Sequence, residues 1–171
     1  MPGTAIIPMF RKGSRPALFS WLLVFAISLT ALAAEPLVGT ASVIDGDTIE
    51  IHGQRIRLHG IDAPESRQEC TRSDGATWRC GQQAALALSD RIGRSVVRCD
   101  PRDRDRYGRI IAICFKGTED LNRWMVASGR AVAYRKYSLD YVADEERAHA
   151  ARVGIWSGTF TMPWDWRSQK Q

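Results

Sequence analysis

Hydrophobic and polar residues follow two different patterns along this chain. Residues 17–33 contain only apolar residues, Ser and Thr, and they follow the basic residues Arg11, Lys12 and Arg15. The run ends in Ala31-Leu32-Ala33, a small-x-small pattern typical of a signal-peptide cleavage site. We therefore predict a signal peptide over residues 1–33 and one domain over residues 34–171. The alternative is an uncleaved membrane anchor, because 17 residues is the lower limit for a spanning helix.

Beyond residue 34 the pattern changes to short segments of alternating or β-branched residues, which indicate strands. We predict five strands, over residues 38–44, 48–51, 55–61, 96–99 and 109–115. The third strand alternates clearly, with Ile56 and Leu58 on one face and Arg57 on the other. Residues 62–79 lack a regular pattern and are predicted to form a loop, which at this length is usually functional or cross-linked.

Helical spacing appears three times. Ala84, Leu88 and Ile92 lie four residues apart and predict a helix over 81–93 that ends at Gly93. Further helices are predicted over 120–128, with Asp120 as its N-cap, and over 140–153, whereas the aromatic tail 156–167 is predicted to be irregular. The predicted order is three strands, a helix, two strands and two helices, which is the order of an OB-fold. We therefore predict an α+β protein, mainly β, built on a five-stranded OB-fold barrel with three helices.

Cysteine content and charge place limits on the function. Four cysteines in an exported chain predict disulfides, and of the three pairings we favour Cys70–Cys80, which closes a short loop, and Cys99–Cys114, which ties neighbouring strands. Removing the three basic residues of 1–33 from the total of 24 leaves 21 against 19 acidic residues. This small excess does not by itself predict a polyanionic partner, so local clusters must do so. Both interpretations of the leader place the domain outside the cytoplasm: secreted, periplasmic or membrane-anchored.

Three polar clusters stand at the ends of predicted strands. They are Asp45-Gly46-Asp47-Thr48, Asp62-Ala63-Pro64-Glu65 and Asp105-Arg106-Tyr107-Gly108-Arg109. Each cluster alone is a common turn or loop sequence. Together, in this order and at strand ends, they indicate a single site.

The residue types in these clusters suit phosphodiester hydrolysis. Asp47 and Asp62 provide hard oxygen ligands for one cation, with backbone carbonyls and water completing the shell, which favours Ca²⁺. Arg57 and Arg109 can each form forked hydrogen bonds with phosphate oxygens. Glu65 is placed to orient or deprotonate the attacking water.

These motifs resemble the thermonuclease (staphylococcal-nuclease-like) family over residues 38 to 157. The resemblance rests on the DGDT turn, the run from Arg57 to Glu65, the DRYGR segment at 105–109 and the late Gly154-Ile155-Trp156-Ser157. It implies an OB-fold, Ca²⁺ as cofactor, and cleavage of DNA and RNA with little sequence preference to leave 3′-phosphate ends. The chain looks like a cysteine-containing, secreted bacterial branch of this family.

The resemblance also assigns roles to individual residues. It implies that Asp47, Asp62 and the backbone carbonyl of Ala63 bind Ca²⁺, with Asp45 in the outer coordination sphere. The catalytic residues it implies are Arg57, Glu65 and Arg109, and the nucleotide contacts are Tyr107 and Tyr134.

The chain departs from the family pattern at two places. Ala63 stands where members often have Thr, which a main-chain ligand tolerates. The loop from Cys70 to Cys80 is absent from the simplest members, and relatives with it are sometimes labelled as exopolysaccharide-biosynthesis proteins. The alternative function is thus a non-catalytic OB-fold module of the envelope that binds nucleic acid or protein, linked to exopolysaccharide biosynthesis. We expect single-stranded DNA or RNA as the partner, and a monomer without a stable protein partner.

Overall fold

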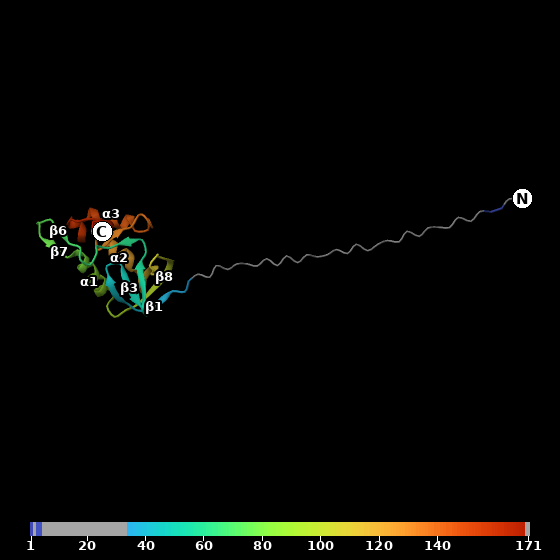
Figure 1. The fold of residues 1–171 in the computed structure, drawn as a ribbon, viewed down its shortest axis with the longest axis horizontal. Coiled ribbons are helices and arrows are strands. Elements are labelled where there is room, and N and C mark those ends of the chain that lie inside the picture. The colour runs from blue at the N-terminus through green and yellow to red at the C-terminus, as the bar shows by residue number, and fades with distance from the viewer. Residues whose placement is uncertain (2, 5–33, 170–171) are drawn as a thin grey trace. The chain divides into compact units, whose positions relative to one another are not determined.

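The computed structural model describes residues 1, 3, 4 and 34–169 (Figure 1). The apolar run 17–33 and its cleavage site lie outside the described residues, so the signal peptide stays a prediction. Among the described residues, no helix is long and apolar enough to cross a membrane. The account that follows concerns the folded unit Ala33–Gln171.

Strands dominate the first two thirds of the folded unit and helices the last third. The strands are β1 (Leu37–Thr40), β2 (Ser42–Asp45), β3 (Thr48–Ile51), β4 (Gln54–Leu58), β5 (Ile61–Asp62), β6 (Cys70–Arg72), β7 (Thr77–Trp78), β8 (Val96–Arg104), β9 (Ile110–Lys116), β10 (Glu119–Asp120), β11 (Val132–Ala133) and β12 (Gly158–Thr159). The helices are α1 (Cys80–Ile92), α2 (Leu121–Ala127), α3 (Val142–Ala150), the 3₁₀ helix η1 (Gly154–Ser157) and α4 (Pro163–Ser168).

The main sheet closes on itself. Its strand order is β1-β8-β9-β4-β3-β2, with β10 added beside β9. The two ends of this order, β1 and β2, are separated along the chain only by Ala41, so they are two halves of one bent strand. One half pairs with β8 and the other with β3, which makes a barrel of five strands. The predicted OB-fold barrel is thereby confirmed.

The barrel interior and α1 share one core. The inward residues of β3 and β4, including Ile49, Ile56 and Leu58, are at most 1% exposed. Ala84 and Leu88 of α1 are fully buried against this core, as their helical spacing predicts. Helix α1 therefore seals one end of the barrel, beside the turn between β2 and β3.

Register fixes the side of the sheet from which Arg57 projects. The parallel pair β4–β9 matches Ile56 with Ile110 and Arg57 with Ile111. Because side chains alternate along strands, Arg57 and Ile111 project from the same side of the sheet, opposite the buried Ile56. Arg109 stands one residue before β9, in the turn that joins β8 to this strand.

The predicted helices are present, and several other predictions need correction. Helix α2 begins after Asp120, whose carboxylate accepts the Arg123 amide at 3.0 Å. The strand predicted over 38–44 is broken at Ala41, because its first half, β1, pairs with β8 and its second half, β2, pairs with β3. The strand predicted over 55–61 is interrupted at Gly60, which has a φ of 72° that breaks the ladder.

Two segments predicted to lack regular structure are partly ordered into elements. The loop 62–79 contains the hairpin β6–β7, which projects from the domain away from β8 (Figure 1). The tail predicted as irregular contains β12, which pairs with β6, and the helix α4. The helix predicted over 140–153 is confined to Val142–Ala150.

Both predicted disulfides are confirmed. Cys70–Cys80 closes the β6–β7 hairpin onto the start of α1. Cys99–Cys114 joins directly opposite residues of β8 and β9. The first cross-link therefore fixes the insertion beside Glu65, and the second lies within the barrel wall.

Candidate active site

The turn between β2 and β3 presents the first carboxylates. The Asp47 amide donates to Asp45 Oδ1 at 3.1 Å, which closes the turn, and Thr48 Oγ1 donates to Asp47 Oδ1 at 3.1 Å. A side chain at Gly46 would place its Cβ 2.7 Å from that of Ala63 and 2.9 Å from that of Ala84. Glycine is thus needed here because the turn packs directly on α1 and on the loop after β5.

The loop after β5 is tied to this turn. The Ala63 amide donates to Asp47 Oδ2 at 3.0 Å. Asp62, the last residue of β5, is held from the other side by the pairing of β5 with β11. Its side chain is fully buried, and that of Asp47 is 5% exposed.

One guanidinium group bridges the two carboxylates. Arg57 on β4 donates from Nη1 to Asp47 Oδ1 at 2.8 Å and from Nη2 to Asp62 Oδ1 at 2.7 Å. The predicted convergence of Asp47, Arg57 and Asp62 is therefore present in the structure. These two bonds use two of the five N–H donors of Arg57, so the remaining donors can bind a further anion.

The pKa values of this cluster are shifted by burial and by the neighbouring charges. Burial, reinforced by the charge of Asp47, raises the pKa of Asp45 to about 6. Burial also raises the pKa of Asp62, because the opposing effects of Arg167 and Arg57 offset it only in part. Burial alone would lower the pKa of Arg57, but the charges of Asp47 and Asp62 outweigh it and raise this pKa.

A second arginine enters the cluster from the C-terminal tail. Arg167 on α4 donates from Nη1 to Asp62 Oδ1 at 3.0 Å and from Nη2 to Asp62 Oδ2 at 2.8 Å. Its Nη1 also donates to Glu65 Oε1 at 2.6 Å. The sequence interpretation missed Arg167. Pro163 at the first turn of α4, followed by Asp165, is the helix-start signal that would have drawn attention to this segment.

Buried Gln68 fixes the loop that carries Glu65. The Glu65 amide donates to Gln68 Oε1 at 3.2 Å, and Gln68 Nε2 donates to the Thr161 carbonyl at 2.6 Å. On the other side, a Cβ at Gly81 would lie 1.7 Å from the Glu65 carbonyl oxygen, so the first turn of α1 packs directly on this loop. Gln68 was also missed, because a single Gln in a loop carries no sequence pattern.

Arg109 and Tyr107 are engaged with Asp105 and with each other in this structure. Arg109 Nε donates to Asp105 Oδ2 at 2.7 Å, and its guanidinium lies 5.7 Å from the centre of the Tyr107 ring. Tyr107 is 69% exposed, so its ring is open to a ligand. Arg109 stands one residue before β9, the strand that pairs in parallel with β4, which carries Arg57.

Tyr134 packs against the same tail that supplies Arg167. Its ring stacks on Trp164 of α4, with centroids 5.3 Å apart and planes 8° apart. Its amide donates to the Gly60 carbonyl at 2.9 Å, which places it near the end of β4. Tyr134 is therefore half-buried, with one neighbour already stacked on it.

The donor set fits a hard divalent cation. The carboxylates of Asp47, Asp62 and Glu65 share the two guanidinium groups of Arg57 and Arg167, and Asp45 adds a fourth carboxylate beside Asp47, which leaves a deficit of positive charge. All available donors are oxygens, which suits Ca²⁺. No three His, Cys, Asp or Glu side chains in the described part of the chain form a metal cluster on their own. Of the predicted ligands, the two carboxylates Asp47 and Asp62 are brought together through Arg57 and could hold such a cation.

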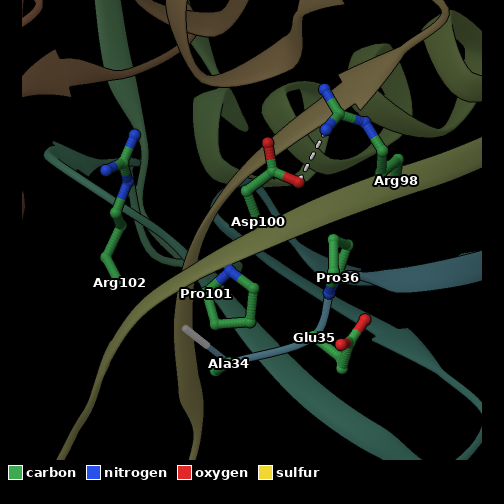
Figure 2. A pocket seen from close by; sticks show the side chains of 7 residues that line it. All are labelled: Ala34, Glu35, Pro36, Arg98, Asp100, Pro101 and Arg102. Atoms are coloured by element: carbon green, nitrogen blue, oxygen red, sulfur yellow. Dashed lines mark hydrogen bonds and ion pairs between the residues drawn. The ribbon is translucent and has the colours of Figure 1, made fainter. Parts of the chain in front are cut away.

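Two surface hollows lie apart from these residues. Figure 2 shows one of about 440 Å³ beside the start of β1, where Arg98 donates to Asp100 at 2.9 Å. The other, of about 590 Å³, lies beside the start of α1 and is lined by three arginines, Arg72, Arg79 and Arg130, and by Trp78. No predicted catalytic or metal-binding residue lines either hollow.

Comparison with known proteins agrees with this geometry. A family model described as "Staphylococcal nuclease homologue" matches residues 55–158. The chain is 45% identical over 127 residues to the "Succinoglycan biosynthesis protein ExoI" of Rhizobium meliloti, covering 72% of this chain and 66% of that protein. It is 30% identical over 162 residues to an "Uncharacterized endonuclease" of Haemophilus influenzae, covering 90% and 85%. It is 32% identical over 143 residues to the "Micrococcal nuclease" of Shigella flexneri, covering 73% and 76%.

Proposed function

Because the chain belongs to the family of staphylococcal nuclease homologues and is a phosphodiester hydrolase, we propose that it is a Ca²⁺-dependent nuclease acting on single-stranded DNA or RNA. The observation that carries the proposal is the convergence of buried Asp47 and Asp62 on the single guanidinium of Arg57. A buried pair of carboxylates beside a bridging arginine is suited to hold a cation and a phosphate at adjacent positions.

In this proposal the metal ligands are Asp47, Asp62 and the Ala63 carbonyl. Asp45 holds the Asp47 backbone in place and adds negative charge beside the ligands. When bound, Ca²⁺ supplies positive charge to offset the negative charge that develops on the phosphate oxygens. The chain's own residues then have to grip the phosphate and activate the water.

Arg57 and Arg109 grip the phosphate. Arg57 has unused N–H donors, and Arg109 stands one residue before β9, the strand that pairs with the strand of Arg57. Glu65 is 35% exposed, so its carboxylate is accessible to water, which it orients or deprotonates for in-line attack on phosphorus. Tyr107 and Tyr134 flank the site and contact the nucleotide. By family resemblance, the products carry 3′-phosphates.

Digestion of a single-stranded DNA oligonucleotide at mildly alkaline pH tests the proposal. We expect cleavage at millimolar Ca²⁺ and none in excess chelator. Glu65→Gln should lower the rate by about 10²- to 10⁴-fold, since it removes the general base. Glu69→Gln, which changes an exposed carboxylate of the same loop, is the matched control and should keep wild-type activity. DNA left intact by the wild-type protein with Ca²⁺ would reject the proposal.

We further propose that the protein acts outside the cytoplasm as a monomer. Two disulfides favour an oxidising compartment. Mass spectrometry of the protein isolated from its native host should show a mature chain that begins near Ala34. A chain that starts at Met1 would favour the anchor instead.

A second candidate function follows from one relative's name. The Rhizobium meliloti relative is named for succinoglycan biosynthesis, which makes a role in envelope polysaccharide assembly the alternative. A polysaccharide phenotype that Glu65→Ala leaves intact in cells would favour this alternative. A phenotype lost with Glu65→Ala would tie it to hydrolysis.

A further inference from the structure

The C-terminal tail lies beyond the part of the chain that the family model matches, yet it reaches the proposed catalytic carboxylates. The match ends at residue 158. After it, the Thr161 carbonyl accepts from buried Gln68, and α4 then carries Arg167 to Asp62 and Glu65. The tail is thus joined to the Glu65 loop at two separate points.

Arg167 Nη1 donates to the Glu65 carboxylate from outside the loop that carries Glu65. The same guanidinium bonds both oxygens of Asp62, so it fixes Glu65 relative to a fully buried carboxylate. Without this bond, the Glu65 side chain would keep its backbone anchor through Gln68 but lose the contact that sets its carboxylate position.

Arg167 also occupies carboxylate oxygens of Asp62 that a bound cation would need as ligands. Asp62 Oδ1 accepts from both Arg57 and Arg167, and Asp62 Oδ2 accepts from Arg167. A cation at Asp62 would therefore approach oxygens already engaged by a guanidinium. Two like charges at such short range repel one another, even with partial screening by solvent.

We propose that Arg167 is a positioning residue of the active site, which holds Glu65 for catalysis and competes with the divalent cation for Asp62. This inference rests on the proposed function. It predicts opposite effects of removing the guanidinium: turnover falls because Glu65 is no longer held, while cation affinity rises because a competing charge is gone. A merely structural role would weaken both.

The test compares Arg167→Gln and Arg167→Lys with the wild-type protein. Calorimetric titration with Ca²⁺ alone, without nucleic acid, gives cation affinity, and kcat and KM come from a single-stranded DNA oligonucleotide at saturating Ca²⁺. For Arg167→Gln we expect a Kd for Ca²⁺ about 5- to 20-fold lower. We also expect a kcat about 10- to 100-fold lower, with KM within about twofold of wild type.

Arg167→Lys separates charge from geometry. Lysine keeps the positive charge but cannot form the fork. We therefore expect Ca²⁺ affinity near wild type and a kcat between those of the wild type and Arg167→Gln. The matched control is Arg94→Gln, which removes an exposed arginine beyond the far end of α1 and should change neither quantity.

Two outcomes overturn the inference and remain distinct from failure of the proposed function. Unchanged or weaker Ca²⁺ binding by a folded Arg167→Gln protein, or a kcat within twofold of wild type, rejects the positioning role while the nuclease stands. A wild-type protein that neither takes up Ca²⁺ nor cleaves DNA rejects both. Should Arg167→Gln fail to fold, Arg167→Lys with wild-type kcat also rejects the role.

Discussion

The bridge formed by Arg57 gives the sharpest prediction about the site. Arg57→Gln removes one charged partner from two carboxylates whose side chains are 5% and 0% exposed. The neutral amide cannot span Asp47 and Asp62 in the same way. The variant should therefore lose stability as well as activity, and the loss of stability should depend on Ca²⁺.

The magnitude follows from the burial of the three groups. Removing one partner of a buried ion pair typically costs about 3–5 kcal/mol. The cost should be near the lower limit, about 3 kcal/mol without Ca²⁺, because Arg57 is 18% exposed and Arg167 still bonds Asp62. In excess Ca²⁺ the cation neutralises the same carboxylates, so the variant should recover about half of this loss.

Urea unfolding followed by circular dichroism, in chelator and in excess Ca²⁺, measures both quantities. Arg55→Gln is the matched control, since Arg55 is an exposed arginine on the same strand, and it should change the free energy of unfolding by less than about 0.5 kcal/mol. A loss below about 1 kcal/mol for Arg57→Gln in chelator, or an equal loss with and without Ca²⁺, would refute the reasoning.

Three further predictions concern the supports of the site. Asp105→Asn should cost about 1–2 kcal/mol at pH 7. Burial would raise the pKa of the Asp105 carboxyl, but hydrogen bonds from Arg109 and Tyr107 and the charge of Arg109 outweigh burial and lower this pKa. The contribution of Asp105 to stability should therefore be present above about pH 4 and disappear as the pH falls below that value. Unfolding measured across an acid pH series would show this loss. Replacing both Cys70 and Cys80 by Ser should lower the free energy of unfolding by about 2–3 kcal/mol, measured in urea. Gly81→Ala should cost about 1–3 kcal/mol and reduce nuclease activity, because its Cβ would displace the Glu65 carbonyl; a variant with wild-type melting temperature and activity would contradict this packing.

The part of the site that the sequence predicts is the part held by nearby segments. Asp47 and Asp62 lie 15 residues apart along the chain, at the ends of strands whose pattern is clear. The pairing of β3 with β4 places Arg57 opposite Thr48, the residue after Asp47, and Asp62 follows Arg57 by five residues. Arg167 and Asp62 are separated by 105 residues in the sequence. No periodic pattern in either segment predicts their contact.

The same reasoning explains which elements were predicted. Ala84, Leu88 and Ile92 repeat at helical spacing because they face one core, so α1 was found within a residue of its true bounds. The break at Ala41 has no such local cause. It arises because the closed barrel requires one strand to pair with β8 in its first half and with β3 in its second, which is a property of the whole sheet.

The closure of the barrel also bears on how the protein behaves at high concentration. Exposed sheet edges are templates for strand addition and aggregation. Here the outermost strands of the ladder are two halves of one segment, each only four residues long. The outer side of β1 is further covered, since a His52 ring nitrogen lies 3.2 Å from the Val38 carbonyl and a Cβ at Gly39 would meet that same ring at 2.6 Å. The main sheet therefore offers a second copy of the chain little room to dock edge to edge.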